Sequence, residues 1–538
     1  MSLRIIHWIA MSILLLCATA CASLPANGPR PPSQAWSAPD ATALGRLVQT
    51  RRAESGSRSA SGFKLIDVME QAYTSRLALA KGAERTIDIQ SYAIHADAST
   101  ETLLQELRQA ARRGVRVRIL LDDFNSVGDD AQVLRLGFEP NVEVRLFNPL
   151  PGPRNNLFGR VMTSLHDIPR IQKRMHNKLF IADNAWGITG GRNIGDRFFG
   201  TGEKLNFVDL DVLAAGAVVR EMSTSFDRYW NDPLAYPVQA ILSKEDLERL
   251  QALPGGGATA DGSPNRAKPL AAVSANSPTI LPNISRAEAQ AAAKPPLDLR
   301  TVPLVWAPST FLGDKPGKIA PGDDEVDAGD TVIDGLLSIM RGARREVVIV
   351  SPYLVPGPQM MAVYAELRQR GVRIRMLTNT MASNDAPAAH AGYLRYREAM
   401  LKLGIELHEM RVDPATTPQL AAAGSSGKGS RASLHTKAVV VDGSLAIVGS
   451  MNLDLRSQIQ NSEVALVIRS APFAAQVLKQ VDDTVASNAY RLDLGSGKLV
   501  WRAPPGAPFK DSTGEPDAPL KMRALVTLIG PFAPEEML

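Results

Sequence analysis

The sequence predicts an α/β protein made of two pseudo-symmetric α/β domains, each a mixed sheet flanked by helices, with one active site at their interface. The chain has 538 residues, more than one hydrophobic core usually serves. Two segments, 85–94 (RTIDIQSYAI) and 345–354 (REVVIVSPYL), each open the same order of strand, helix, glycine and strand. A polar motif also occurs once in each half. Repetition of both features predicts two copies of one fold.

The composition is that of a globular protein with a mildly basic charge. Hydrophobic residues make up 45% of the chain, and 60 Lys and Arg stand against 55 Asp and Glu, a net charge of +5. This balance suits an anionic membrane surface or substrate and gives no argument for nucleic acid. The two cysteines are Cys17 and Cys21. The rest of the chain is therefore predicted to lack a disulfide, a thiolate metal site and a cysteine nucleophile.

Residues 1–21 are predicted to be a lipoprotein signal peptide. Arg4 precedes an apolar run that is too short for a stable span and has no charged stop behind it. The ending ATAC resembles a bacterial lipobox, which implies cleavage before Cys21 and lipidation of its thiol. A signal anchor, or a plain signal peptide with an incidental Cys21, is the alternative. The expected location is the bacterial cell envelope, anchored in the membrane through Cys21 and facing the periplasm.

Low-complexity segments divide the remainder. Residues 22–44 are rich in Pro, Ala and Ser and are predicted to be a tether. A second such stretch, 253–298, is predicted to link a first domain at 45–252 to a second at 299–502. Residues 503–538 form a Pro-rich tail with little periodicity.

Within each domain the elements follow the same order. Helical stretches end at Gly114 and Gly371, and the strands VRVRIL and VRIRML come next. The segments 141–148 (NVEVRLFN) and 404–411 (GIELHEMR) are predicted to be the following strands. Strands joined through helices pair in parallel with right-handed crossovers, which gives the predicted sheet in each half.

The repeated polar motif has the form H-x-K-x4-D-x6-G-[GS]-x-N. Its members are His176, Lys178, Asp183 and Asn193 in the first half, and His435, Lys437, Asp442 and Asn452 in the second. On a strand, positions i and i+2 share a face, so each histidine is predicted to point the same way as its lysine. Burying an imidazole beside an ammonium gains nothing unless an anion lies between them. A lone His-x-Lys is more often an edge-strand accident, but two complete copies among seven histidines indicate function.

Asp183 and Asp442 are counted with the catalytic residues because they belong to the motif. Each stands where the strand is predicted to turn, and turns favour aspartate regardless of chemistry. A structural role is therefore the favoured interpretation, and a catalytic role is the alternative. The pairs Gly190-Gly191 and Gly449-Ser450 are expected to permit close approach of the backbone.

The duplicated motif resembles that of the phospholipase D superfamily. Further segments are similar to the bacterial C-type cardiolipin synthases, namely 120–130 (LLDDFNSVGDD), 190–199 (GGRNIGDRFF), 207–212 (FVDLDV), 226–238 (FDRYWNDPLAYPV) and 351–357 (SPYLVPG). The resemblance covers roughly residues 60–500 and implies two phospholipase D-like domains. The lipobox, the 253–298 linker and the Ala/Gly/Ser-rich loop at 413–431 depart from it. Those departures concern the membrane side and the acceptor substrate, not the chemistry.

Cleavage of a phosphodiester needs a nucleophile, an acid for the leaving alkoxide and cations for the phosphoryl oxygens. The resemblance implies that His176 attacks phosphorus to form a phosphohistidine and that His435 is the acid and base, with the reverse assignment left open. Lys178, Lys437, Asn193 and Asn452 are expected to hold the phosphoryl oxygens. No metal-ligand spacing is visible, and no metal or other cofactor is predicted. The resemblance also implies that carboxylates of Glu463 and Asp209, with Asp211 as the spare, orient the histidines.

The predicted function is therefore that of a membrane-associated phosphatidyltransferase, a cardiolipin synthase. The donor is expected to be phosphatidylglycerol or phosphatidylethanolamine, and the acceptor a second phosphatidylglycerol. The alternatives are a hydrolytic phospholipase D, a nuclease of the superfamily, and a non-catalytic envelope lipoprotein that binds anionic lipid. The expected partners are phospholipids and a membrane surface, without nucleic acid. A helper protein is left open.

Overall fold

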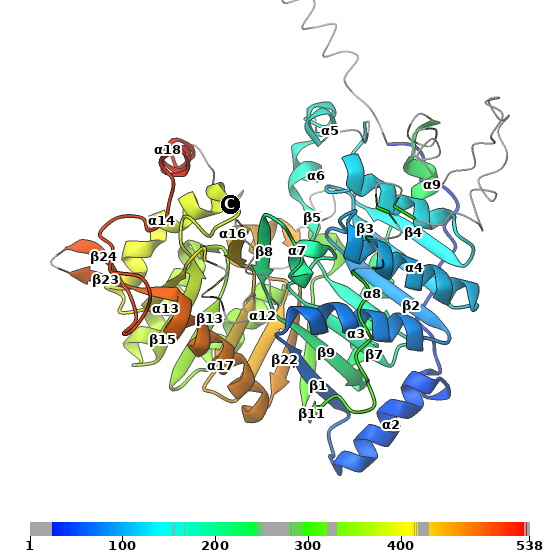
Figure 1. Ribbon diagram of the computed structural model, residues 1–538, viewed down its shortest axis with the longest axis horizontal. Coiled ribbons are helices and arrows are strands. Elements are labelled where there is room, and N and C mark those ends of the chain that lie inside the picture. Colours follow the sequence, from blue (N-terminus) through cyan, green and yellow to red (C-terminus); the bar gives the residue numbers. More distant parts are fainter. Residues whose placement is uncertain are drawn as a thin grey trace, which may run out of the picture.

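The computed structural model describes residues 24–248, 280–319, 331–417 and 430–534, apart from gaps at 153, 155–156, 166, 245, 247, 282–283, 286–287, 289, 291, 414, 416, 496 and 532–533. Within these residues the chain forms two halves that lie side by side, each built on a nine-stranded mixed sheet (Figure 1). This confirms the predicted fold class. Cys21, with the predicted signal peptide, lies outside the described residues.

In the first half, the sheet has a parallel centre and antiparallel flanks. Strands β2, β3 and β4 pair in parallel, and the others pair antiparallel. The order across the sheet is β10 (Ala235–Pro237), β4 (Val142–Phe147), β3 (Arg116–Asp122), β2 (Thr86–Ser91), β6 (Leu179–Ala182), β7 (Trp186–Gly190), β9 (Asp211–Gly216), β1 (Ser61–Ile66) and β11 (Val305–Trp306).

The second sheet repeats this arrangement. Here β13, β15 and β16 are the parallel strands, and they correspond to β2, β3 and β4. The order is β12 (Ser309–Gly313), β22 (Val464–Arg469), β19 (Leu445–Gly449), β18 (Ala438–Val441), β13 (Glu346–Val350), β15 (Arg373–Asn379), β16 (Glu406–Met410), β23 (Ala489–Gly495) and β24 (Lys498–Arg502).

Helices cover the outer face of each sheet and fill the space between the sheets. On the outer faces the cores are closed by α3 (Met69–Gly82) and α4 (Ala98–Arg112) in the first half, and by α12 (Val332–Arg341) and α13 (Gly357–Gln369) in the second. A central core contains side chains of both sheets together with α8 (Ala217–Trp230) and α17 (Ala471–Asn488). The two halves therefore share one hydrophobic interior, which fixes them against each other.

The helices that precede the repeated strands begin and end at residues suited to those positions. The side chain of Asp97 accepts a hydrogen bond from the N–H of Thr100 and so caps α4. After α4 and α13, Gly114 and Gly371 adopt left-handed conformations, with φ of +93° and +78°. A residue with a Cβ is strained there, which explains why glycine ends both helices.

Two short parallel strand pairs join the halves. Strand β8 (Leu205–Val208) pairs with β17 (Arg431–Leu434), and β5 (Arg174–Met175) pairs with β21 (Asn461–Ser462). Both β17 and β5 lead directly into a repeated motif. The backbone hydrogen bonds between the halves therefore lie beside the motif residues.

Several segments of low complexity have structure. In the tether, the N–H of Ser33 donates to the side chain of Asn231 at 3.0 Å, which holds 24–38 against the first half. The tail contains a helix, α18 (Leu520–Ile529), and α2 (Ala43–Ser55) begins the first half. Helix α14 (Pro387–Lys402) is long, and the short α-helices of the described residues are α5 (Leu157–Thr163), α6 (Ile168–Gln172), α7 (Asp196–Phe199), α9 (Val238–Ile241) and α16 (Leu455–Ile459). Within the described part of the chain, no helix is both long and apolar enough for a membrane span.

Candidate active site

Both motif histidines line one cavity between the halves. The cavity has a volume of about 450 Å³, and its walls include His176, Asn193, His435 and Asn452. His176 stands between β5 and β6, and His435 between β17 and β18. The histidine and lysine of each copy thus occupy the extended link before a strand, rather than the strand itself as the alternation predicted. The next residues, Leu179 and Ala438, begin the strands.

Each histidine is oriented by a carboxylate from the opposite half. Nδ1 of His176 lies 2.9 Å from Oε2 of Glu463, and Nδ1 of His435 lies 2.6 Å from Oδ2 of Asp209. With Nδ1 held, Nε2 is the ring atom left for chemistry. The spare candidate, Asp211, contacts neither imidazole and forms an ion pair with Arg76 at 3.0 Å.

The two dyads differ electrostatically. Burial lowers the pKa of His176 well below its usual value, and the neighbouring ammonium groups of Lys178 and Lys437 lower it further. Burial also raises the pKa of Glu463 to about 7. Burial and Lys437 lower the pKa of His435 too.

The Asp209 dyad behaves differently from the Glu463 dyad. Burial alone would raise the pKa of Asp209, but the contact with His435 outweighs it and the pKa is lowered. Asp209 therefore opposes the lowering of the His435 pKa by burial and Lys437, whereas for His176 the lysines add to the effect of burial.

The residue after the first motif glycine, Ser450 in one half and Gly191 in the other, lies against the carboxylate of a dyad in both halves. The hydroxyl of Ser450 donates to Glu463, and the hydroxyl of Ser457 donates to it at 2.9 Å. The equivalent position in the first half is Gly191, where an added Cβ would lie 2.2 Å from Oδ1 of Asp209. The first half therefore needs glycine there because the carboxylate occupies the space of a side chain.

The motif lysines are buried and form the same contacts in both copies. Lys178 Nζ donates to the carbonyl of His176 at 2.9 Å, and Lys437 Nζ donates to that of His435 at 2.5 Å. Burial lowers the pKa of Lys178 to about 7 and that of Lys437 to about 8. Nearby carboxylates, Glu463 for Lys178 and Asp209 for Lys437, oppose this shift. An anionic phosphoryl group bound nearby would favour the charged ammonium form of both.

Two tyrosines that the sequence argument did not single out complete this arrangement. The Lys178 ammonium lies 5.6 Å from the ring centre of Tyr92, and that of Lys437 lies 5.9 Å from the ring centre of Tyr353. Both tyrosines line the cavity, and each follows the first parallel strand of its half. The repeated segments SYAI and SPYL carried this signal, since a tyrosine stands near the same place in each copy.

The motif asparagines line the cavity, and their side-chain oxygens have no hydrogen-bond partner. The side-chain oxygens of Asn193 and Asn452 are buried and accept no hydrogen bond. A buried acceptor without a partner is costly, so these oxygens are available to a hydrogen-bond donor of a bound ligand, and only the side-chain N–H groups can meet phosphoryl oxygens. Amide N–H groups at these positions fit phosphoryl oxygens.

The two motif aspartates lie away from the cavity and organise backbone. The Asp183 carboxylate accepts hydrogen bonds from the N–H groups of Glu84, Arg85 and Thr86 at 2.7–2.9 Å. Asp442 does the same for residues 344–346 in the second half. Both have left-handed backbone, with φ of +52° and +53°. These contacts fit the favoured structural role, because both carboxylates hold the backbone where the strands β2 and β13 begin, and the catalytic role stays a prediction.

The cavity also contains residues that no motif indicated. Nδ1 of His95 lies 2.9 Å from Asp130, although the sequence argument gave His95 no role. The Tyr353 hydroxyl donates to Asp385 at 2.9 Å. The cationic members of the wall are Arg197 and Arg456. Arg197 and Arg456 are equivalent positions of the repeat, since each stands four residues after its motif asparagine, so the repeat spacing did carry a signal for this pair.

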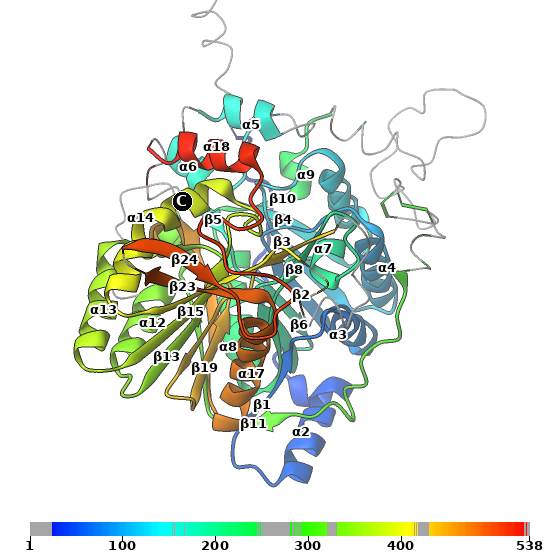
Figure 2. The ribbon, with the colours of Figure 1, turned by 60° about the vertical axis from the view of Figure 1, so that its left-hand side comes forward.

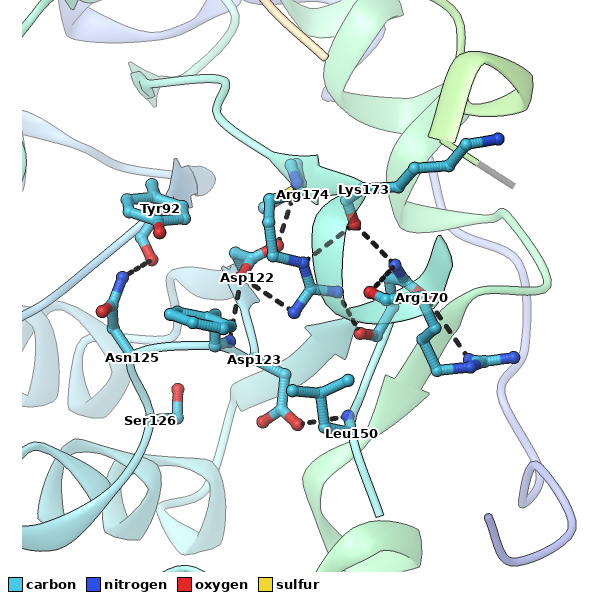
Figure 3. A network of polar contacts seen from close by, with 12 residues as sticks. Tyr92, Asp122, Asp123, Asn125, Ser126, Leu150, Arg170, Lys173 and Arg174 are labelled. Atoms are coloured by element: carbon cyan, nitrogen blue, oxygen red, sulfur yellow. Dashed lines mark hydrogen bonds and ion pairs between the residues drawn. The ribbon is translucent and has the colours of Figure 1, made fainter. Parts of the chain in front are cut away.

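A polar network ties the His176 segment to the end of β3 (Figure 3). Asp122 accepts hydrogen bonds from the N–H of Met175 at 2.8 Å and lies 3.4 Å from the Arg174 guanidinium. The next residue, Asp123, accepts from the N–H of Leu150 at 2.9 Å and from Arg154 at 2.6 Å. The segment that precedes the histidine is therefore held on both sides, by the sheet of its own half and by β21 of the other. Among the described residues, no group of three or more His, Cys, Asp or Glu is arranged to bind a metal ion.

Comparison with known proteins identifies the family of the chain. The chain matches the family described as "Cardiolipin synthase, PLD-like domain" over residues 77–230 and 336–484. It is 35% identical over 431 residues to cardiolipin synthase C of Escherichia coli (strain K12), covering 80% of this chain and 86% of that protein. It is 23% identical to cardiolipin synthase A of Pectobacterium carotovorum subsp. carotovorum (strain PC1), covering 83% of this chain and 73% of that protein.

Among solved structures, the fold is similar to that of the phosphatidylserine synthase of Haemophilus influenzae Rd KW20. The TM-score is 0.52 at 17% sequence identity, with 82% of this chain and 92% of that one covered. This likeness concerns the fold, and the sequence relatives concern the family. Together with the two matched repeats, they show that the chain belongs to the phospholipase D superfamily, among its cardiolipin synthase-like enzymes.

Proposed function

We propose that the chain is a membrane-associated phosphatidyltransferase that makes cardiolipin through a phosphohistidine intermediate. The observation that carries the proposal is the pair of crossed dyads, His176 with Glu463 and His435 with Asp209, on the wall of one cavity. Two imidazoles with free Nε2 atoms are what a two-step displacement at phosphorus requires. Relatives named cardiolipin synthase supply the substrate class.

In the first step, Nε2 of His176 attacks the phosphorus of the donor lipid. A P–N bond forms and the P–O bond to the leaving alcohol breaks, while Nε2–H of His435 gives its proton to the leaving oxygen. Lys178, Lys437 and the two motif asparagines hold the phosphoryl oxygens as charge builds on them. In the second step, His435 takes a proton from the acceptor hydroxyl, whose oxygen attacks phosphorus and releases His176.

The environments of the two rings support this division of roles. A nucleophile must be unprotonated, and burial with two neighbouring ammonium groups lowers the pKa of His176 well below normal. An acid must hold a proton when substrate binds, and Asp209, whose own pKa is lowered by the contact with His435, opposes the effect of burial and Lys437 on that ring.

The donor is expected to be phosphatidylglycerol or phosphatidylethanolamine, and the acceptor a second phosphatidylglycerol. The test is expression in a cardiolipin-deficient host, with each candidate donor labelled in turn and the lipids separated by chromatography. Cardiolipin is expected with the unaltered chain and absent with His176→Ala. Free phosphatidic acid as the sole product would instead identify hydrolysis. An unchanged lipid profile would favour a non-catalytic, lipid-binding role.

The same proposal places the chain in the bacterial cell envelope, anchored through a lipidated Cys21 and facing the periplasm. The lipobox-like ending of the apolar N-terminus supports it. Metabolic labelling with a radioactive fatty acid is expected to mark the unaltered chain and not Cys21→Ser. Labelling of both proteins would contradict lipidation at this thiol.

A further inference from the structure

The large hydrophobic side chains that are exposed in the described part of the chain are confined to a few short segments. They lie in α5, α6 and the link between them, in α16, and in α18. The residues are Phe158, Met162, Leu165, Ile168, Ile459, Leu520, Leu525 and Leu528. Single exposed apolar residues scattered over a surface need no explanation, but their concentration in one region indicates a binding surface. These eight residues are called the apolar rim below.

Helix α5 is turned with its charge inward and its apolar residues outward. The Arg160 side chain is completely buried, forms an ion pair with Asp123 and donates to the carbonyls of Asp123 at 2.9 Å and Leu150 at 3.0 Å. On the outer side, Phe158 is 76% exposed and Met162 is 48% exposed. A surface helix ordinarily buries its apolar face, so this helix has the opposite orientation. The buried ion pair holds it in that orientation.

Helix α18 presents the matching surface on the second half. It packs through Val526 against Met381, Ala382 and Ala391. Leu525 and Leu528 remain outside, and Leu528 is 68% exposed. Lys521 is exposed beside Leu520, which places a cation at the edge of this face.

The helices that carry the rim lie on one side of the molecule, and two of them are joined to the wall of the catalytic cavity. In both views α5, α6 and α18 lie at the same end of the molecule, while α2 lies at the other (Figures 1 and 2). Helix α16 carries the exposed Ile459 and also Arg456, which lines the cavity and donates to the carbonyl of Gln172 at the end of α6 at 3.2 Å. Helix α14, against which α18 packs, begins in the cavity wall with Ala388 and Ala389.

We propose that the apolar rim is the surface by which the catalytic body docks onto an anionic phospholipid bilayer. The inference rests on the proposed function, because a lipid substrate must pass from the bilayer into the cavity. Apolar side chains that enter the acyl boundary, with arginine and lysine at headgroup level, are the arrangement of an interfacial membrane-binding surface. A second copy of the chain is the other occupant to consider, but seated on the rim it would cover the route of the substrate.

Docking is tested by an environment-sensitive fluorophore placed at single cysteines. In the full chain with Cys17→Ser and Cys21→Ser, a nitrobenzofurazan probe is attached through Phe158→Cys, Leu528→Cys or, as the control on distant α2, Ser55→Cys. Vesicles of phosphatidylglycerol and phosphatidylethanolamine are expected to blue-shift and brighten the first two probes several-fold and leave the third unchanged. No change at either rim position would overturn the proposal. A change that follows protein concentration without vesicles would assign the rim to self-association instead.

A kinetic arm separates failure of docking from failure of the catalytic proposal. Phe158→Ser with Met162→Ser is expected to lower the transfer rate on vesicles about tenfold or more, as lost burial of two apolar side chains implies. On a short-chain lipid below its micelle concentration, the rate is expected to stay the same. Equal rates on vesicles would refute a role for the rim. If the unaltered chain transferred no lipid on either substrate while the rim probes still responded to vesicles, the proposed reaction alone would be refuted.

Discussion

Oε2 of Glu463, on the second half, lies 2.9 Å from Nδ1 of His176, on the first, and Oδ2 of Asp209 on the first lies 2.6 Å from Nδ1 of His435 on the second. Each imidazole is thus positioned across the junction. The pKa of both imidazoles is lowered by burial, whereas the carboxylates differ, since burial raises the pKa of Glu463 to about 7 and the contact with His435 lowers that of Asp209. The two repeats are similar in backbone and different in electrostatics.

The first prediction concerns the division of roles between the histidines. With a phosphodiester that has a nitrophenolate leaving group, formation of the phosphohistidine needs no acid. His435→Asn is therefore expected to accumulate a labelled, acid-labile and base-stable adduct, detected after rapid denaturation. His176→Asn is expected to show none. With natural lipid, both variants should lose on the order of 10²–10⁴ in kcat. An adduct on the His176→Asn protein would reverse the assignment.

The second prediction tests Gly191. A Cβ there would lie 2.2 Å from Oδ1 of Asp209, so Gly191→Ala is expected to displace the carboxylate from His435 and lower kcat roughly 10²-fold. Asp209→Asn should have a similar effect, and the double variant should be no worse than either, because both changes act on one contact. Gly317→Ala, where the added methyl meets nothing within 4 Å, is the control. Additive losses would show that Gly191 acts elsewhere.

The third prediction is the alkaline limb of the pH profile. An ammonium is charged below its pKa, so phosphate binding by Lys178 and Lys437 is present at low pH and is lost as pH rises through about 7 and 8. The measured kcat/KM should therefore fall above this range. The fall in kcat should come at higher pH, because bound phosphate stabilises the ammonium form. A kcat/KM that stays flat up to pH 10 would contradict it.

The fourth prediction is that the motif aspartates act on stability. Asp183→Asn keeps a side chain that tolerates the left-handed backbone and removes one carboxylate acceptor. It is expected to lower the free energy of unfolding by ~1–3 kcal/mol. Asp442→Asn should cost less, since Asp442 is only partly buried. Denaturant unfolding gives both values. The folded variants should retain kcat, and a loss of activity without a loss of stability would support a catalytic role.

The fifth prediction concerns the ion pairs beneath α5. Asp123→Asn leaves Arg154 and Arg160 buried without their carboxylate, and breaking a buried pair typically costs ~3–5 kcal/mol. The free energy of unfolding should fall by about this amount. Asp129→Asn, on the exposed side of the same loop, should change it by less than about 0.5 kcal/mol. Equal effects of the two changes would mean that the buried pairs contribute little.

The fold was predictable because each element of the repeat has a local sequence pattern that occurs in both halves. Strand periodicity and the glycines at 114 and 371 fix the elements, and the duplicated motif brings its histidines to one place. The crossing of the dyads was not predictable, because sequence spacing does not say which carboxylate meets which ring. Glu463 and Asp209 were predicted to orient histidines only through the family resemblance. The structure pairs each with the ring of the other half.

Other features escaped prediction for equally physical reasons. Arg197 and Arg456 each stand four residues after a motif asparagine, but arginine is common on solvated surfaces, so the spacing alone did not indicate that this pair lines the cavity. Helix α18 lies in a segment whose prolines and weak periodicity gave no helical signal. The outward orientation of the apolar residues of α5 depends on the ion pair between Arg160 and Asp123. These residues are 37 positions apart, so no local pattern predicts the contact.

The short parallel pairs β5–β21 and β8–β17 have a consequence for how this architecture tolerates change. Together with the shared hydrophobic core, they set the mutual alignment of the two imidazoles. The pair β5–β21 leads into His176 and Glu463, and β8–β17 leads into Asp209 and His435. A slip of one residue at either seam would therefore move the carboxylate of that dyad away from its ring. Selection is thus expected to fall on the seams.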